Sequence, residues 1–269
     1  MLFLSDKLLM IIKLLWIYFL LITDIACYAQ NVNTVTTQQL NTRSINLTYT
    51  VRDNENTIAN NSIQQVDSIA HSSEMARHFC QVYSKTLKNI ASQMQDMDSG
   101  AKVFINKFEI GFVDSFLNAR VNDKNGNLSP ESEWKCFFSN PTAQPWQLVL
   151  LGVNAHTNVN IWQALVNNFS EREIRQYKKQ YLALKYSVAK VYYQFFDTLM
   201  SHNSYLRFIN SLTLGLAKKI GERIMFKWRR RNVNLAIMYY QDQEKFKRRL
   251  AIVNRKKQKN DQRILRYKS

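Results

Sequence analysis

From Val66 onward, apolar residues recur at helical spacing. One apolar face spans residues 66–99 and contains Ile69, Ala76, Phe79, Tyr83, Leu87, Ile90 and Met94. A second face has a phenylalanine at every fourth position (Phe104, Phe108, Phe112 and Phe116) and ends with Ala119. Residues spaced by three and four lie on one side of a helix. We therefore expect two long helices, the first of which ends near Ser99–Gly100.

Two further signals predict where later helices begin. Ser129 followed by Pro130 predicts the start of a short third helix after an Asn-Gly turn. Ser170 and Glu173 form the S-x-x-E pattern of a capping box. A long helix is therefore expected to begin there and to run to about Phe195.

The rest of the chain also favours helices. Residues 205–257 predict one or two helices, with a break near Gly221. The chain has only six Gly and three Pro, which leaves little room for a sheet-rich fold. We expect an all-α protein: a single bundle-like domain of six or seven helices over residues 66–245, followed by a basic helix or tail over residues 246–269.

The first 29 residues have the pattern of a signal peptide. Lys7 and Lys13 precede an apolar run, and small residues stand at Cys27 and Ala29. We expect cleavage after Ala29 and export to the periplasm or to the outside of the cell. Two alternatives stay open: a lipoprotein acylated at Cys27, and an uncleaved anchor. For an anchor, the nine apolar residues after Lys13 fall short of the roughly 20 that span a membrane.

Residues 30–65 differ in composition from the helical region. They are rich in Asn, Thr and Gln and contain neither Gly nor Pro. Within them Ile45, Leu47, Tyr49 and Val51 alternate at period two, which predicts one short strand. Because a lone strand is not stable by itself, this polar leader is expected either to dock on the domain or to act as a linker.

Removal of the first 29 residues leaves two cysteines, Cys80 and Cys136. In an oxidising compartment these two could form a disulfide. The alternative is a pair of separate buried thiols, because free cysteine packs as a small apolar residue.

Positive charge is concentrated at the C-terminal end. Residues 218–269 contain 18 Lys and Arg against four Asp and Glu, so this segment carries +14 of the net charge of +17. Such a field attracts an anionic membrane surface, lipopolysaccharide phosphate or nucleic acid. The alternative is a helix packed into the bundle with its charges outward. No nucleic-acid-binding module is recognisable, and no specific nucleic-acid target is expected.

The apolar stretch LLGVNAHTNVNIWQAL (150–165) contains Asn154, His156, Asn158 and Asn160. On a helix, His156 and Asn160 share one face, and Asn154 and Asn158 share an almost opposite one. Buried amides need partners. Either these side chains form a network that holds neighbouring helices together, or they line a binding or catalytic pocket. In the second case His156 would be the catalytic residue, and the three asparagines would orient a ligand.

This stretch resembles the G-x-N-A-H-I-N-x-D-L signature of an uncharacterised, largely bacterial helical family, a domain of unknown function. Gly152, Asn154, Ala155, His156 and Asn158 match it, whereas Asn160 stands at the place of the acidic residue. HFCQVYSKT (78–86), KFEIGFVDSFLNA (107–119) and, loosely, RRRNVNLA (229–236) are similar to flanking elements. The resemblance implies a helical domain and no established activity.

Three functions follow from these observations. The first is an exported helical protein whose buried polar pocket around His156 binds, or acts on, a small or lipid-like ligand. The second is a non-enzymatic envelope protein whose cationic C-terminal helix binds anionic lipid or a partner. The third is a metal-dependent hydrolase, since His and Asp at i, i+4 can chelate a metal. Asn160 is a poor metal ligand, however, so we name no metal site, and the sequence indicates no cofactor.

Overall fold

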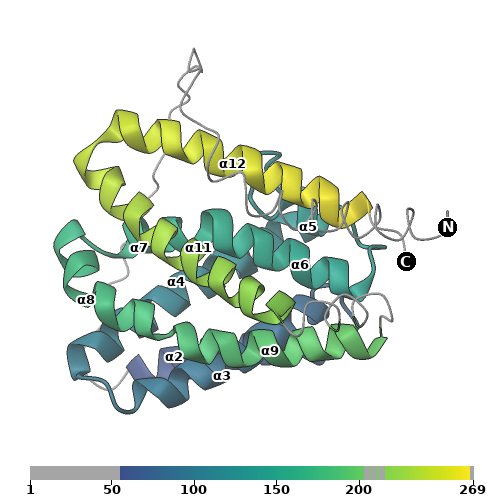
Figure 1. Cartoon of the computed structure of the whole chain (residues 1–269), viewed down its shortest axis with the longest axis horizontal. Helices are drawn as coiled ribbons and strands as arrows, with labels where there is room; N and C mark the ends of the chain where they lie inside the picture. The colour runs from purple at the N-terminus through teal and green to yellow at the C-terminus, as the bar shows by residue number, and fades with distance from the viewer. Residues whose placement is uncertain (1–54, 203–206, 208–210, 212–215, 267–269) are drawn as a thin grey trace, which may run out of the picture. The chain divides into compact units, whose positions relative to one another are not determined.

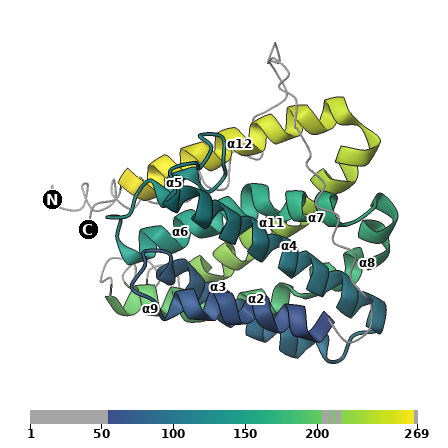
Figure 2. The same ribbon diagram turned by 180° about the vertical axis from the view of Figure 1, so that it is seen from behind.

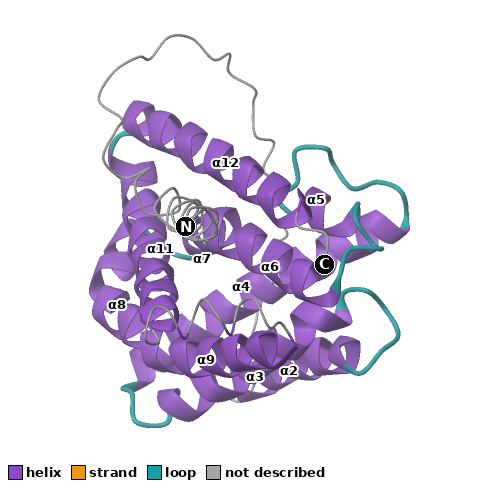
Figure 3. Ribbon diagram, turned by 45° about the vertical axis from the view of Figure 1, so that its right-hand side comes forward, coloured by secondary structure: helices purple, strands orange, loops and turns teal. Residues whose placement is uncertain are grey.

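The computed structural model describes residues 55–202, 207, 211 and 216–266, all within the compact unit Tyr49–Ser269. Every regular element among them is a helix, and Figure 3 shows no strand in this part of the chain. The predicted all-α class is therefore confirmed. Cleavage after Ala29, acylation of Cys27 and the strand over residues 45–51 fall outside the described residues.

The expected first helix is in fact two helices. α2 (Glu55–Ala70) and α3 (Arg77–Met94) pack against each other across a turn over residues 71–76. In this turn the Ser72 hydroxyl donates to the Ile69 carbonyl at 2.8 Å and accepts from the Glu74 amide at 3.2 Å. Such local side-chain bonds compete with the helical ladder. Apolar spacing continues across the turn, so the pattern alone did not reveal it.

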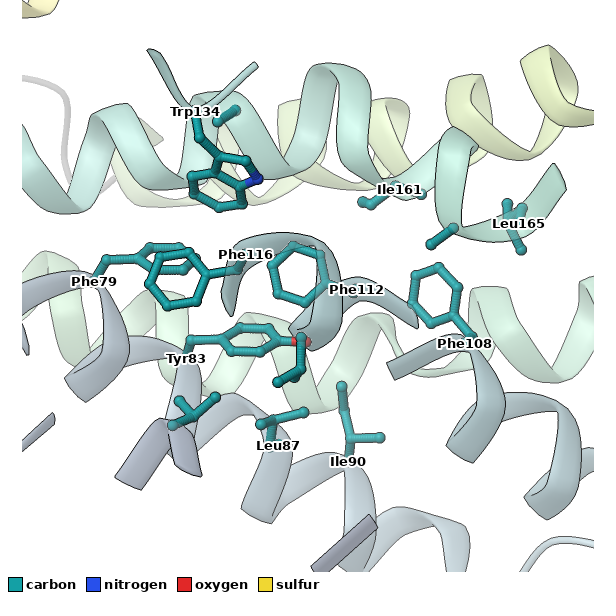
Figure 4. Packing of buried hydrophobic residues seen from close by; sticks show 14 of the residues in the cluster. Phe79, Tyr83, Leu87, Ile90, Phe108, Phe112, Phe116, Trp134, Ile161 and Leu165 are labelled. Carbon is teal, nitrogen blue, oxygen red and sulfur yellow. The ribbon is translucent and has the colours of Figure 1, made fainter. Parts of the chain in front are cut away.

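The second predicted helix is α4 (Ser99–Lys124), and its phenylalanine stripe is the centre of the core. The Asp98 carboxylate caps it by accepting from the Ala101 amide at 2.8 Å. Gly100 therefore lies in the first turn of α4, and the prediction that it marks a helix end was wrong. The four phenylalanines are each 2 % exposed or less. Figure 4 shows three of them, Phe108, Phe112 and Phe116, among the other core side chains.

The Asn-Gly turn that follows α4 is present, with Gly126 at φ 70°. The short helix α5 (Lys135–Phe138) begins later than Ser129 predicted, after Trp134. Trp134 is fully buried, and its ring centroid lies 5.0 Å from that of Phe116. The position of α5 is thus set by burial of an indole, which a capping signal does not record.

The polar stretch lies in a continuous central run of three elements. α6 (Pro145–Ala155) passes into a π-helical turn, η1 (His156–Asn160), which leads into α7 (Ile161–Asn168). This central run contacts α3 and α4, and it also contacts α11 (Leu216–Gln241) and α12 (Gln243–Arg266). Figures 1 and 2 show it between α12 and the layer that contains α3.

The capping box at Ser170 is confirmed as the start of α8 (Glu171–Ala183). The Ser170 hydroxyl accepts from the Glu173 amide, and the Glu173 carboxylate accepts from the Ser170 amide at 2.8 Å. The expected single helix to Phe195 nevertheless breaks at the buried Leu184, and α9 (Lys185–His202) follows. α9 then packs along α3, where the Ser187 hydroxyl donates to the Asn89 carbonyl at 3.1 Å.

The expected break near Gly221 is also absent. α11 runs through this residue. A Cβ atom there would lie 1.9 Å from the Tyr192 hydroxyl oxygen of α9, so the position has room only for glycine. The glycine permits close approach of two helices. The break comes at Asp242, whose carboxylate accepts from the Lys245 amide at 2.9 Å and caps α12. Because two expected long helices each divide, the described part of the chain has more than six or seven helices.

Helical structure extends on both sides of residues 66–245, from Glu55 to Arg266. None of the helices among the described residues combines the length and the apolar character needed to cross a membrane.

Candidate functional site

The polar residues of the central run are buried, and the helix widens where they lie. Asn154 is 4 % exposed, and Asn158 and Asn160 are each 1 % exposed. The π-helical turn spans His156–Asn160. Turns of this type are rare and are frequent at functional sites.

Asn154 and Asn158 face the C-terminal helices. The Asn154 amide donates to the Asp261 carboxylate at 2.7 Å and to the Lys257 carbonyl at 3.0 Å. Asn158 donates to the Asn154 side-chain oxygen at 2.6 Å, and Arg231 donates to the Asn158 side-chain oxygen at 2.8 Å. We call these five residues the α12 clasp.

The α12 clasp supports the structural alternative for two of the predicted ligand residues. Lys257 and Asp261 form a buried ion pair at 2.7 Å, with side chains 10 % and 7 % exposed. Every bond of Asn154 and Asn158 described above joins the central run internally or to α11 and α12. Their amides are therefore used inside the protein.

His156 and Asn160 face the opposite side, toward α3 and α4. The His156 ring lies edge-on to Phe112, with centroids 3.8 Å apart, and 5.8 Å from the ring of Tyr83. Asn160 donates to the Ser115 hydroxyl at 2.6 Å. Nδ1 of His156 and Oδ1 of Asn160 have no hydrogen-bond partner on another helix, although the two side chains interact with each other.

Although His156 is only half-buried by area, its ring is enclosed by protein. Burial and, secondarily, the charge of Arg229 lower the pKa of His156 to about 3, against a smaller opposing effect of Asn160. The imidazole is thus neutral at neutral pH. It can donate or accept a hydrogen bond, but it is a weak base.

A buried carboxyl group is linked to this imidazole through Tyr83, whose ring lies 5.8 Å from that of His156. Glu109 is 8 % exposed and accepts a hydrogen bond from the Tyr83 hydroxyl at 2.6 Å. Burial raises the pKa of Glu109, while the Tyr83 hydrogen bond and the charge of Arg229 oppose this shift. Glu109 is the acidic group of the site.

The position of Glu109 in the sequence indicates that it is buried, because apolar residues stand four positions before and after it. Ile105 and Val113, four positions before and after it, are both fully buried. A carboxylate between two buried positions of one helix face is expected to be buried itself. The phenylalanine stripe lies on the adjacent face of α4, one position away from Ile105, Glu109 and Val113.

Arg229 completes the group from α11. It is 5 % exposed, its guanidinium lies 4.3 Å over the Tyr181 ring, and it donates to the Tyr181 carbonyl at 3.1 Å. Nε of Arg229 and the hydroxyl of Tyr181 have no partner. We call the following six residues the polar core cluster: Tyr83, Glu109, His156, Asn160, Tyr181 and Arg229.

The cluster brings hydrogen-bonding groups from five segments into the interior. They come from α3, α4, η1, α8 and α11. A buried polar atom without a partner costs about 1–3 kcal/mol, so protein cores contain few of them. Two such atoms, the hydroxyl of Tyr181 and Nε of Arg229, occur in this cluster beside the interacting pair His156 and Asn160. Hydrogen bonding to an anion or to a polar group is the chemistry that these atoms offer.

His71 and Glu74, two potential metal ligands near the start of α3, have other partners. Glu74 pairs with Arg120 and with Lys124, and Nδ1 of His71 lies 2.7 Å from the Asp67 carbonyl oxygen. No group of three His, Cys, Asp or Glu that could hold a metal ion is found in the part of the chain that the structure describes.

Cys80 and Cys136 are free thiols in the structure. Burial raises the pKa of Cys80 to about 12. Burial, and then the charge of Asp261, raise the pKa of Cys136 to about 11. Both groups are therefore protonated and weakly nucleophilic at neutral pH.

Several cations of the basic segment 218–269 have internal roles. Arg229 belongs to the polar core cluster, and Arg231 and Lys257 belong to the α12 clasp. Net charge in this segment is therefore not a direct measure of the charge at its surface.

Comparison with known proteins identifies a family. Residues 60–264 match the model of a family described as "Family of unknown function (DUF5995)". The match includes every residue of the polar core cluster and of the α12 clasp. Comparisons with curated proteins and with solved structures gave no match.

Proposed function

Because the chain belongs to the DUF5995 family, whose function is unknown, we propose a function from geometry alone: the polar core cluster binds a small or lipid-like ligand. The ligand would bond to His156, Asn160, Tyr181 and Arg229. The opposite face of the central run, with the α12 clasp, would hold the site in shape.

One observation carries this proposal. The hydroxyl of Tyr181 and Nε of Arg229 are buried in one cluster without partners, beside the side chains of His156 and Asn160, which interact with each other. In the α12 clasp, by contrast, both asparagine amides are bonded within the protein, and the unpartnered atom is Nε of Arg231. Unpaired buried groups in one place require an explanation, and a bound ligand would supply the missing hydrogen-bond partners.

The cluster also suggests a division of roles. His156, with a pKa of about 3, hydrogen-bonds the ligand as a neutral ring. Glu109 is better suited to proton transfer, because burial raises its pKa above the ordinary value of a carboxyl group. The sequence assigned catalysis to His156; the geometry favours a binding role for it and an acid role for Glu109.

Tyr181→Phe tests the proposal, because it removes one unpartnered hydroxyl and almost no volume. The variant should unfold at the same denaturant concentration as the wild type or at a higher one, since no internal hydrogen bond is lost. With benzoate, phenyl phosphate, phenol and octanoate as probes, at least one should raise the wild-type Tm and raise that of the variant less. A loss of stability in Tyr181→Phe would show that the hydroxyl is bonded within the protein and would refute the site.

Tyr83→Phe is the matched control. It also deletes a buried tyrosine hydroxyl, but this one donates to Glu109 at 2.6 Å. It should therefore lower stability, which separates loss of an internal bond from loss of an unpaired group.

A further inference from the structure

A positively charged hollow of about 680 Å³ lies between α8, α9 and α11. Six of the residues that line it are cations, and none is acidic: Arg175, Lys178, Lys179, Lys185, Arg229 and Arg230. Its volume is within the range of small-molecule sites.

Little of this charge is neutralised within the described part of the chain. Arg175 pairs with Glu171 at 2.8 Å, and no carboxylate lies in ion-pair range of the other five cations. Lys178 donates instead to the neutral Asn234 side chain at 3.2 Å. Like charges gathered in a hollow repel one another and raise the local potential, which an anion relieves.

The hollow also has an aromatic wall. Nζ of Lys185 lies 4.8 Å from the ring centroid of Tyr186 and 5.6 Å from that of Phe226. Tyr186 is 66 % exposed, an unusual state for a large aromatic side chain. A ligand with an apolar or aromatic part beside its negative charge would cover these rings.

Arg229 connects the hollow to the interior. It lines the hollow, yet it is 5 % exposed and its Nε has no partner. A buried guanidinium requires an anion or several acceptors, and its planar fork fits the oxygens of a phosphate group. The hollow therefore contains a fixed, desolvated anchor as well as surface lysines.

We propose that this hollow binds the phosphate group of a ligand that also carries an apolar or aromatic substituent. Arg229 and Lys185 would hold the phosphate, with Lys179 and Arg230 at the rim and Tyr186 and Phe226 against the substituent. This inference rests on the proposed function, because Arg229 also belongs to the polar core cluster. The hollow would admit a phosphate-bearing ligand, and this specifies the class of ligand that the polar core cluster binds.

Isothermal titration calorimetry of the full chain with phenyl phosphate and with inorganic phosphate provides the test. Phenyl phosphate should bind more tightly than inorganic phosphate, and Tyr186→Ala should remove most of that preference. The double variant Lys179→Glu/Arg230→Glu changes two exposed rim residues and should weaken phenyl phosphate binding by about tenfold or more.

The matched control is Lys190→Glu/Lys259→Glu, which makes the same change of charge at two exposed residues outside the hollow. Its affinity should stay within about twofold of the wild type. Equal weakening in both double variants would show a diffuse effect of net charge and would overturn the proposal. Absence of saturable phosphate binding would overturn it as well.

Two more measurements separate the outcomes. Flotation with phosphatidylglycerol vesicles identifies the source of the phosphate group. Vesicle binding that phenyl phosphate displaces indicates a lipid headgroup, and phosphate binding without vesicle binding indicates a free phosphate ester.

Tyr181→Phe separates the proposal for the hollow from the proposal for the polar core cluster. Phosphate affinity that depends on the rim cations but not on Tyr181 would leave the hollow intact as a site and refute the polar core cluster as one.

Discussion

Asn154 of the central run donates a 2.7 Å hydrogen bond to Asp261 of the last helix, 107 positions away along the chain. Asp261 is also paired with Lys257 at 2.7 Å. Together these bonds attach α12 to α6 through charged groups in the interior, where burial makes the removal of one partner more damaging than the removal of a pair.

Asp261→Ala should therefore be strongly destabilising. It leaves the buried Lys257 ammonium without a counter-charge, and we expect a loss of about 3–5 kcal/mol in the free energy of unfolding, measured with urea. Hydrogen exchange should increase first in residues 243–266.

The double variant Lys257→Met/Asp261→Leu is the control for this prediction. It removes both charges and keeps apolar volume, so its loss should be smaller than that of Asp261→Ala. A double variant as unstable as the single one would show that the pair itself, and not an orphaned charge, stabilises α12.

The Tyr83–Glu109 hydrogen bond should show energetic coupling. Tyr83→Phe orphans a buried carboxyl oxygen and should lower stability by about 1–3 kcal/mol. In a Glu109→Leu background the same substitution should cost much less, because no acceptor remains. Equal costs of Tyr83→Phe in the two backgrounds, by urea unfolding at pH 7, would exclude the bond.

His156 should make stability depend on pH. Its pKa is about 3 in the folded protein and about 6.5 in the unfolded chain, so only the unfolded chain gains a proton between these values. The contribution is fully present above pH 6.5 and is lost as pH falls toward 3. Between pH 7 and pH 5 the loss from this group is about 2 kcal/mol.

Comparison of variants isolates this effect. The difference in unfolding free energy between pH 7 and pH 5 should shrink by about 2 kcal/mol in His156→Gln. His71→Gln, which changes an exposed histidine in the turn before α3, should retain most of the wild-type difference. Identical pH profiles of wild type and His156→Gln would mean that the imidazole is accessible to protons.

Gly152 allows α3 and α6 to approach closely. A Cβ atom at this position would lie 2.4 Å from a ring carbon of Phe79, which is itself 2 % exposed and packed among other aromatic rings. Gly152→Ala should therefore destabilise by about 1–3 kcal/mol despite the higher helix propensity of alanine.

Gly111→Ala is the matched control in α4. Its Cβ atom would meet the end of the Asn168 side chain, which can move aside more easily than a ring held in the core. Thermal unfolding should show a smaller loss for Gly111→Ala than for Gly152→Ala. The reverse order would indicate that the α3–α6 contact adapts readily.

The central polar stretch shows what spacing can predict. His156 and Asn160 were expected on one face and Asn154 and Asn158 on almost the opposite one, and the two pairs do contact different helices. Spacing did not predict which pair would find all its hydrogen-bond partners within the protein. The partners Asp261 and Lys257 lie over 100 residues away, and a single sequence contains no record of such a contact.

Local patterns by themselves determined the helical class, the buried phenylalanine face of α4 and the capping box at Ser170, because these depend on residues within one or two turns of each other. Only the tertiary structure decided that helices break at Ser72 and Leu184 and that Gly221 serves close packing. It also decided that Glu109 bonds to Tyr83 and that Arg229 comes near His156 in the core. These outcomes depend on which surfaces face each other after folding. Burial raises the pKa of Glu109, lowers that of His156 and leaves Nε of Arg229 without a partner, and none of these effects follows from local sequence.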